Sequence, residues 1–208
     1  MARIDSKCKL CRREGEKLLL KGERCLSSKC AFQRRSYVPG IHGPKRPGRQ
    51  TDFGKQLREK QKAKRVYGVS ETQFANYYEK AMKMKGDSGV NLVQLLELRL
   101  DNVLYRAGLA KSRAAARQIA SHSHIAINDK NVNIPSYRVR PGEVIVIQSR
   151  KQNKTPWKTI GENLKNHETP SWMTLDPSAL SVKITSLPAA DDLKQIFDPK
   201  LIIEYYSR

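Results

Sequence analysis

All four cysteines of this 208-residue chain lie within its first 30 residues. Cys8 and Cys11 form a C-x2-C pair, and Cys25 and Cys30 form a C-x4-C pair after a gap of thirteen residues. Thiolates bind zinc well, and two close pairs joined by a loop can supply the four corners of a tetrahedral site. We therefore predict a structural Zn²⁺ site made by these four residues.

Other states of the four thiols stay open. An iron–sulfur cluster is also held by four thiolates and is the main alternative cofactor. A disulfide is disfavoured because no signal peptide is seen, and unconnected buried thiols would make the paired spacing a coincidence. The basic residues around the cysteines would present a cationic surface to RNA: Lys7, Lys9, Arg12, Arg13, Lys21 and Arg24.

The charge of the chain predicts a polyanionic partner. Its 40 Lys and Arg residues face 20 Asp and Glu residues, a formal charge of +20. Residues 1–66 hold 20 basic and 6 acidic residues, so the excess is greatest there. Nucleic acid is the expected partner. A membrane surface is the alternative, but no 18-residue apolar run occurs, so we expect a cytoplasmic protein without a membrane partner.

The elements that would position these groups begin with a loop. Residues 36–51, SYVPGIHGPKRPGRQT, are too rich in Gly and Pro for a helix, and we expect an extended basic arm. Residues 52–85 follow with helical periodicity, and Ser70 suits the start of a second helix. Phe74, Tyr77, Tyr78, Ala81 and Met82 recur at helical spacing and are expected in the core.

The stretch from Leu98 to Ile147 changes its period from helix to strand. LDNVLYRAGLA and KSRAAARQIASH predict two short helices, with Gly108 ending the first and Ser112 capping the second. Arg113 and Arg117 are four residues apart and share a helical face. The runs 125–127 and 132–134 predict a hairpin joined at Asn128-Asp129, and 144–147 a buried strand.

The last part of the chain reads as a sheet extension and a helix. Residues 149–156, SRKQNKTP, form a basic connector, and Leu180, Val182 and Ile184 alternate as in a strand. Asp198 and Pro199 suit the N-cap and first position of a final helix.

RLDNVLYRAGLAKSRAAARQIASHSHIAIN, with NIPSYRVRPGEVI, resembles the S4 RNA-binding module. Together with LKGERCLSSKCAFQRRSYVPGIHG and the flanks, the chain is similar to the family of bacterial small-subunit ribosomal protein four, in its cysteine-containing form. The chain departs from the family at Ser123, where Gly is usual, and at Asn128-Asp129, where Asn-Gly is usual. Asp tolerates left-handed backbone better than most residues, so the turn can form.

The resemblance implies an α+β fold. Residues 1–45 would form a zinc knuckle and basic arm, and 46–97 a helical rRNA-binding domain. Residues 98–160 would form the S4-type module, and 161–208 a sheet extension whose final helix returns to the helical domain. The implied partners are the 5′-domain junction of small-subunit rRNA, small-subunit ribosomal protein five, and mRNA near the entry channel. The implied role is to nucleate 5′-domain assembly and to affect translational accuracy.

The residues predicted to contact RNA combine the basic stretches with the positions that match the module. Tyr67 beside Arg65 is expected as a stacking contact, whereas the histidines have a hydrogen bond at a helix end as their alternative role. The full set is Lys21, Arg24, Arg34, Arg35, His42, Lys45, Arg46, Arg49, Arg58, Lys62, Arg65, Tyr67, Lys111, Ser112, Arg113, Arg117, His122, His124, Lys130 and Arg138.

Catalysis is not expected. Some pseudouridine synthases carry the same module with a catalytic Asp in a Gly-Arg-Leu-Asp context. Here Arg99-Leu100-Asp101 lacks the Gly and lies in helical sequence. Gly43-x4-Gly48 is followed by Arg49-Gln50 where a phosphate loop needs Lys-Ser/Thr. The sequence therefore predicts a non-enzymatic, ribosomal RNA-binding protein.

Overall fold

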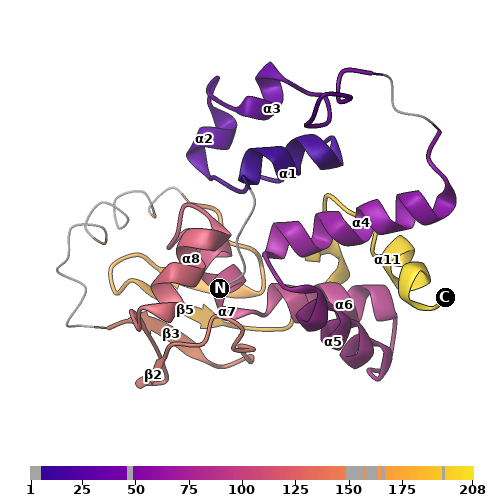
Figure 1. The fold of residues 1–208 in the computed structure, drawn as a ribbon. Coiled ribbons are helices and arrows are strands. Elements are labelled where there is room, and N and C mark those ends of the chain that lie inside the picture. Colours follow the sequence, from indigo (N-terminus) through magenta and orange to yellow (C-terminus); the bar gives the residue numbers. More distant parts are fainter. Residues whose placement is uncertain (1–5, 46–48, 149–156, 158–163, 165–166, 194) are drawn as a thin grey trace. The chain divides into compact units, whose positions relative to one another are not determined.

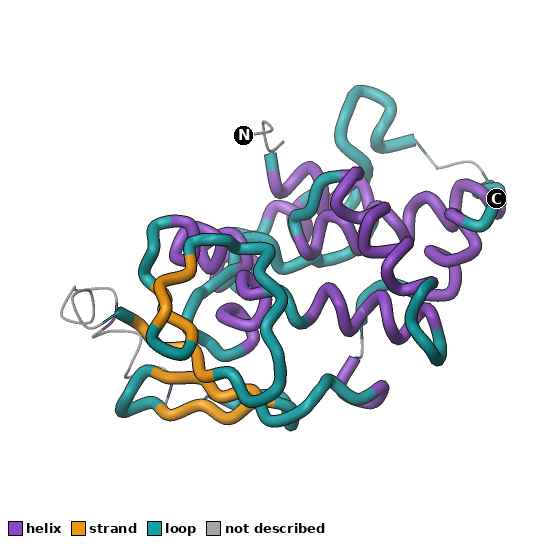
Figure 2. Tube along the Cα trace, turned by 90° about the horizontal axis from the view of Figure 1, so that it is seen from below, coloured by secondary structure: helices purple, strands orange, loops and turns teal. Residues whose placement is uncertain are grey.

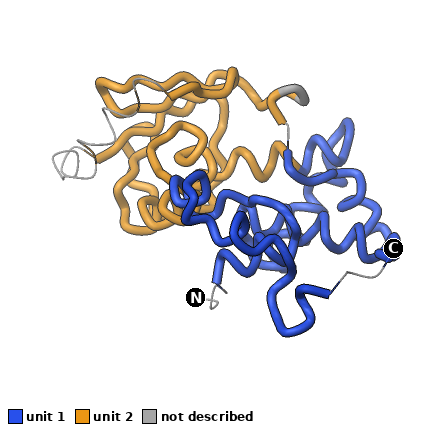
Figure 3. Tube along the Cα trace, turned by 90° about the horizontal axis from the view of Figure 1, so that it is seen from above, with its two compact units in different colours: residues 1–92, 195–208 blue, residues 93–194 orange. Residues whose placement is uncertain are grey.

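The computed structural model describes residues 6–45, 49–148, 157, 164, 167–193 and 195–208. The chain divides into two compact units (Figure 3). Unit 1 comprises residues 1–92 and 195–208, and unit 2 comprises residues 93–194. Predicted contact Arg46 and the predicted connector 149–156 lie outside the described residues.

Unit 1 is helical (Figure 1). Its helices are α1 (Lys7–Glu14), α2 (Glu23–Leu26), α3 (Ala31–Arg34), α4 (Asp52–Tyr67), α5 (Glu71–Met82) and α11 (Pro199–Tyr206); α6 (Ser88–Glu97) begins in this unit. Helix α11 lies beside α4, and Gln56 Nε2 donates to Glu204 Oε2 at 2.9 Å between them. The last helix therefore belongs to the same unit as the first 92 residues.

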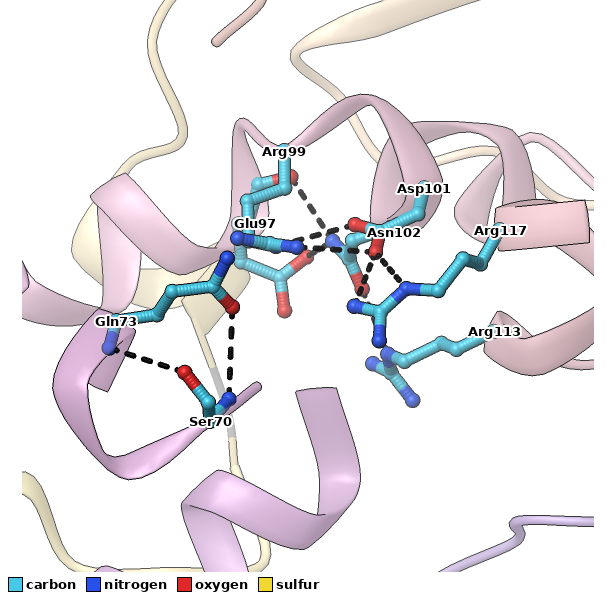
Figure 4. Close-up of polar contacts among 8 residues, drawn as sticks. All are labelled: Ser70, Gln73, Glu97, Arg99, Asp101, Asn102, Arg113 and Arg117. Carbon is cyan, nitrogen blue, oxygen red and sulfur yellow. Dashed lines mark hydrogen bonds and ion pairs between the residues drawn. The ribbon is translucent and has the colours of Figure 1, made fainter. Parts of the chain in front are cut away.

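Side-chain caps fix the starts of these helices. Ser70 Oγ accepts from the N–H of Gln73, whose side chain accepts from the N–H of Ser70, a capping box visible in Figure 4. Asp198 accepts from the N–H of Lys200, and Pro199 occupies the first turn of α11. The predicted helix starts at Ser70 and Asp198 are confirmed.

The aromatic core of unit 1 joins α5 to α11. Phe74 is fully buried, and the Tyr78 ring stacks on that of Tyr206 with centroids 4.8 Å apart. Ala81 is buried as expected, but Met82 is 47% exposed. The expectation for Met82 was wrong because α5 ends at this residue.

Unit 2 places a mixed set of helices and strands around one apolar core, which confirms the α+β class (Figure 2). Its elements are α7 (Leu100–Arg106), α8 (Arg113–Ser121), β1 (Ile125–Ile127), β2 (Lys130–Val132), β3 (Val144–Ile147), β4 (Met173–Asp176), β5 (Ser181–Ile184) and the 3₁₀ turn η1 (Ala190–Leu193). The antiparallel sheet has the order β2-β1-β3-β5-β4. Buried side chains from α7, α8 and the strands form one cluster.

The β1–β2 hairpin turns at Asn128 and Asp129, whose φ angles are +45° and +66°. Positive φ at both central residues is the signature of the type I′ hairpin turn. Ile127 therefore pairs with Lys130, and β2 ends at Val132. The predicted strand 132–134 was wrong because the two-residue turn fixes the register and leaves Ile134 56% exposed.

The remaining strands agree in part with those predicted from the sequence. Strand β3 has the predicted bounds, and β5 begins at Ser181 because Leu180 has a φ of +48°. Strand β4 was not expected, and its Met173 packs in the core beside Trp172. Among the described residues, no helix has the length and apolar character needed to cross a bilayer.

Candidate nucleic-acid interface

The α7–α8 pair of unit 2 positions the predicted arginines. Gly108, with a φ of +79°, follows the end of α7, and Ser112 Oγ accepts from the N–H of Ala115 at 3.3 Å to start α8. Arg113 and Arg117 then lie one turn apart and both reach toward α7 (Figure 4). The predicted boundaries of the two helices are confirmed at Gly108 and Ser112.

Asp101 is the anchor for one of these arginines. Its Oδ2 accepts from Arg117 Nη2 at 2.7 Å and from Arg117 Nε at 3.1 Å. Arg99 donates to both carboxylate oxygens of Asp101, each at 3.1 Å (Figure 4). Arg99 and Asp101 are 1% and 2% exposed, whereas the Arg117 side chain is 35% exposed. A buried ion pair thus holds a guanidinium that reaches the surface.

A parallel chain of contacts holds Arg113. Its Nε donates to Asn102 Oδ1 at 2.7 Å, and its guanidinium carbon lies 4.5 Å from the centroid of the Tyr105 ring. Asn102 Nδ2 in turn donates to Glu97 Oε2 at 2.7 Å. Arg106 donates to both carboxylate oxygens of Glu97, at 3.0 and 2.9 Å. The amide of Asn102 therefore links Arg113 to Glu97 (Figure 4), and Glu97 in turn pairs with Arg106.

The network holds four guanidinium groups against two carboxylates and keeps a positive excess. Fixing an arginine by its Nε leaves its terminal nitrogens in a defined plane, which suits a phosphate or a base edge. The sequence analysis found Arg113 and Arg117 but missed Glu97, Arg99, Asn102 and Arg106. Arg99, Asn102 and Arg106 recur at helical spacing, but such a spacing does not show which side chains pair. Only the acidic first turn of α7 at Asp101 hinted at the arrangement.

The other predicted contacts in this unit differ in their placement. Lys111, His122, Lys130 and Arg138 are exposed. Ser112 serves as the α8 N-cap, so its hydroxyl has a structural role. The half-buried His124 lies against Trp157 with ring centroids 5.8 Å apart.

In unit 1 the residues of α4 that were predicted to contact RNA form ion pairs with carboxylates of the same unit. Arg58 and Arg65 both pair with Glu14, whose side chain is fully buried. Lys62 pairs with Glu16 at 2.9 Å and with Glu59 at 2.7 Å. Lys62 is 8% exposed, and its ammonium group joins α4 to the segment that follows α1.

Burial and charge shift the pKa values of these paired groups. Burial raises the pKa of the Glu14 carboxyl, and attraction to Arg65 and Arg58 opposes this without cancelling it. Burial acts to lower the pKa of Lys62, but hydrogen bonds to Glu59 and Glu16 outweigh it and the pKa rises. Lys62 therefore stays charged and keeps both carboxylates paired.

Tyr67 is 2% exposed, and its ring meets Phe197 edge to face with centroids 6.2 Å apart. This ring has no open face on which a base could stack. Tyr67 is therefore a core residue, and its expected role as a stacking contact was wrong.

The remaining predicted contacts of unit 1 are exposed. These are Lys21, Arg24, Arg34, Arg35, His42, Lys45 and Arg49. They lie on α2, α3 and the loops around them. Their side chains can meet a polyanion without unfolding any part of the unit.

The four cysteines are all free thiols, with Cys11, Cys25 and Cys30 buried and Cys8 half-buried. Burial raises the pKa of the Cys11 thiol, and the charges of the other three sulfurs act in the same direction. The N–H of Lys21 donates to Cys25 Sγ at 3.3 Å. The donor set suits zinc, but among the described residues no three Cys, His, Asp or Glu side chains are arranged to hold a metal ion.

Two family models match the chain in succession: "Ribosomal protein S4/S9 N-terminal domain" over residues 3–97 and "S4 domain" over residues 98–145. Small ribosomal subunit protein uS4 of Caldicellulosiruptor bescii is 50% identical over 205 residues, which cover 99% of the chain and 98% of that relative. The chain belongs to the uS4 family of small-subunit ribosomal proteins.

Other uS4 proteins match at similar levels. That of Thermus thermophilus is 49% identical over 97% of the chain and 96% of the relative, and that of Nitrosospira multiformis is 48% identical over all of both. The family resemblance is therefore confirmed. As a member of the uS4 family, the chain is a structural constituent of the small ribosomal subunit and not an enzyme.

Proposed function

We propose that this uS4 protein is a primary rRNA-binding protein that recognises the 5′-domain junction of small-subunit rRNA and nucleates assembly there. The observation that carries the proposal is the pair Arg113 and Arg117, held on one face of α8 by Asn102 and Asp101. Guanidinium groups fixed before binding lose little conformational freedom when they meet phosphates. Exposed Lys111, His122, Lys130 and Arg138 extend this RNA surface within unit 2.

The exposed cations of unit 1 form the second part of the proposed RNA surface. The formal charge of +20 supports this, because much of the chain's basic excess meets no carboxylate. Arg58 and Arg65 pair with Glu14 of α1, and Lys62 pairs with Glu16 just after it, so these α4 side chains hold in place the segment that carries the exposed cations. Contact with small-subunit protein five, a place near the mRNA entry channel and an effect on decoding accuracy complete the proposed role.

Salt dependence tests the RNA part of the proposal. A protein that neutralises roughly 6–10 phosphates should lose about 10³–10⁵-fold in affinity between about 50 and 200 mM salt. Filter binding of the full chain to a 5′-domain rRNA fragment measures this slope. A nearly constant affinity over this range would contradict a surface built from so many cations.

We also propose that Cys8, Cys11, Cys25 and Cys30 hold a structural zinc ion. The proposal is supported by the paired spacing of the four cysteines and by the burial of three thiols. Binding would draw the four sulfurs together, because the described residues do not already arrange three ligands around a metal ion. When bound, zinc would cross-link the segment around α1 to that around α2 and α3 by its bonds to the thiolates.

Metal content and thermal stability test the zinc proposal together. Purified chain should contain one zinc per molecule by mass spectrometry, and a chelator should lower Tm. Cys25→Ser should lose both the metal and the chelator effect, whereas Ser27→Ala, at a nearby exposed position, should keep them. Iron with a visible absorption band would instead favour an iron–sulfur cluster, and a metal-free chain of unchanged Tm would contradict both.

A further inference from the structure

Residues 195–208, which we call the closing segment, belong to unit 1 although the whole of unit 2 precedes them in the sequence (Figure 3). The segment contains α11, which lies beside α4. Three of its hydrogen bonds to α4 and α5 span 135, 139 and 148 positions of the sequence. Unit 1 is therefore closed by residues that are synthesised after unit 2.

The first turn of α11 fits closely against α4 and α6. The N–H of Asp198 donates to Glu59 Oε2 at 3.0 Å. A Cβ atom added to Gly89 in α6 would lie 3.2 Å from the Cβ of Pro199, closer than two such atoms normally approach. The start of the closing segment is thus held both by a hydrogen bond and by the absence of a side chain at Gly89.

The last turn of α11 is held by Tyr206. Its hydroxyl donates to Glu71 Oε1 at 2.8 Å, and its ring stacks on those of Tyr78 and Phe74 with centroids 4.8 and 6.2 Å apart. Lys60 Nζ donates to the same Glu71 oxygen at 2.7 Å and lies 5.6 Å from the centroid of the Tyr206 ring. This single side chain therefore connects α11 to both α4 and α5.

The closing segment covers an apolar face. Tyr67 of α4 is 2% exposed and packs on the ring of Phe197, and Phe74 of α5 is fully buried beneath Tyr206. Ile202, in the middle of α11, is also fully buried. At a synthesis rate of about 5–20 residues per second, α4 and α5 wait on the order of 10 s for this cover.

Helix α11 depends on docking for its stability. It has eight residues, and isolated helices shorter than about 12–15 residues are marginal in water. Loss of the contacts with α4 and α5 should therefore also unfold the helix, so the closing segment opens as one body. Among the described residues, the apolar cluster of unit 2 contains no side chain of this segment, so its core survives the opening.

Unit 2 prepares the docking because its own two ends meet. Gln94 Nε2 donates to the carbonyl of Pro188 at 2.7 Å. Before unit 2 folds, docking of the closing segment must close a loop of more than a hundred residues. The entropy cost of closing a loop rises with the number of free residues in it. Folding of unit 2 removes most of these residues from the loop and makes docking easier.

We propose that the closing segment is a latch that docks on unit 1 last, after unit 2 has folded, and that opens as one body while unit 2 stays folded. The latch sets the folding order of a unit whose parts are separated in the sequence. It leaves α4 and α5 uncovered until the closing segment has been synthesised. The latch does not depend on the proposed binding to rRNA, so each proposal can fail without the other.

The test uses the full chain and three single variants. Tyr206→Phe removes the hydroxyl that binds Glu71 and keeps the stacked ring. Tyr205→Phe is the matched control, because in the described part of the chain the neighbouring Tyr205 hydroxyl makes no hydrogen bond. Ile202→Ala removes a buried side chain from the docked face and is the stronger variant.

The first measurement is native-state hydrogen exchange followed by mass spectrometry. Peptides of the closing segment should exchange about tenfold or more faster in Tyr206→Phe, because a hydrogen bond to a charged group is lost. The increase should be about 30-fold or more in Ile202→Ala and less than about twofold in Tyr205→Phe. Peptides of β1, β3 and β5 should keep the wild-type rates in all three variants.

Two results of this measurement would overturn the latch. An equal increase in the closing segment and in the strands of unit 2 would show that the chain opens as a whole. An unchanged exchange of the closing segment in Tyr206→Phe and Ile202→Ala would show that docking does not protect it.

The second measurement is refolding of the full chain with pulsed hydrogen exchange, which tests the order. Amides of β1, β3 and β5 should become protected before those of α11. Tyr206→Phe should leave the rate at which the strands become protected within about twofold of the wild type, because its contact forms after they do. Protection of α11 together with the strands, or before them, would overturn the proposal.

Discussion

Arg117 and Asp101 meet through two hydrogen bonds to a single carboxylate oxygen, at 2.7 and 3.1 Å. The arginine reaches the surface of α8, whereas the aspartate is 2% exposed at the start of α7. The same carboxylate accepts from buried Arg99. Asp101 therefore holds one guanidinium at the surface of α8 and neutralises another inside the protein.

Asp101→Asn should destabilise the chain strongly. It removes the negative charge with which buried Arg99 pairs, and breaking a buried pair in this way costs ~3–5 kcal/mol. Urea unfolding measures the free energy of unfolding. Asp129→Asn is the matched control, because Asp129 is exposed and Asn accepts its φ of +66°, so a change within about 0.5 kcal/mol is expected. Equal stabilities of the two variants would refute the role of Asp101.

Lys62→Gln should lower stability and leave RNA binding nearly unchanged. The substitution removes a positive charge from between Glu16 and Glu59, and a decrease of about 1–3 kcal/mol is expected. Urea unfolding gives the stability, and the salt slope of RNA binding gives the phosphate count. Lys80→Gln, on the exposed surface of α5, should change neither. A slope reduced by about one would show instead that Lys62 contacts a phosphate.

Glu71 should make stability depend on pH in the acid range. Burial acts to raise its pKa, but hydrogen bonds from Lys60, Lys64 and Tyr206 lower the pKa to about 2 from a usual 4.5. A pKa lowered by folding gives stability that is present above 4.5 and is lost as the pH falls toward about 2. The Glu71 side chain is 46% exposed, so salt should weaken the effect.

Between pH 5 and 3, approximately the range in which the unfolded carboxyl titrates, the free energy of unfolding should therefore decrease less in Glu71→Gln than in the wild type. Denaturant unfolding at several pH values measures this loss. Glu79→Gln, at an exposed position of the same helix, should keep the wild-type pH profile. The pairing would be contradicted if both variants followed the wild-type curve.

Asp129→Gly should stabilise the β1–β2 hairpin. Asp129 has a φ of +66° in a type I′ turn, a conformation that glycine adopts without steric cost, so a gain of about 0.5–1 kcal/mol is expected. Asn131→Gly in the adjacent strand should have the opposite effect, because glycine weakens an extended segment by roughly 0.5–1 kcal/mol. Differential scanning calorimetry distinguishes the two directions, and a lower Tm for Asp129→Gly would be inconsistent with the turn.

The sequence predicted those helix starts and turns that depend on contacts between residues close together in the chain. Ser70, Ser112 and Asp198 cap helices because their side chains reach N–H groups two or three residues ahead. The two-residue turn at Asn128 and Asp129 follows from their tolerance of positive φ. The position of β2 was missed by two residues because register depends on the turn.

The contacts that the sequence did not predict involve partners distant in sequence. Arg58 and Arg65 lie 44 and 51 residues from Glu14, so their ion pairs could not be predicted from the basic helix alone, and their contacts with RNA stay a prediction. The burial of Tyr67 depends on Phe197 in the same way. Pairing over such separations has no periodic signature, whereas Arg113 and Arg117 share a helical face and were found.

Discrimination between RNAs tests the central claim most directly. The full chain would be bound to a 5′-domain fragment of small-subunit rRNA and to an unrelated structured RNA of equal length, at about 0.3 M salt to suppress nonspecific attraction. Preference for the rRNA fragment of about 10³-fold or more is expected, on the scale of specific recognition. Equal weak binding to both RNAs would contradict the account and reduce the chain to a general basic RNA binder.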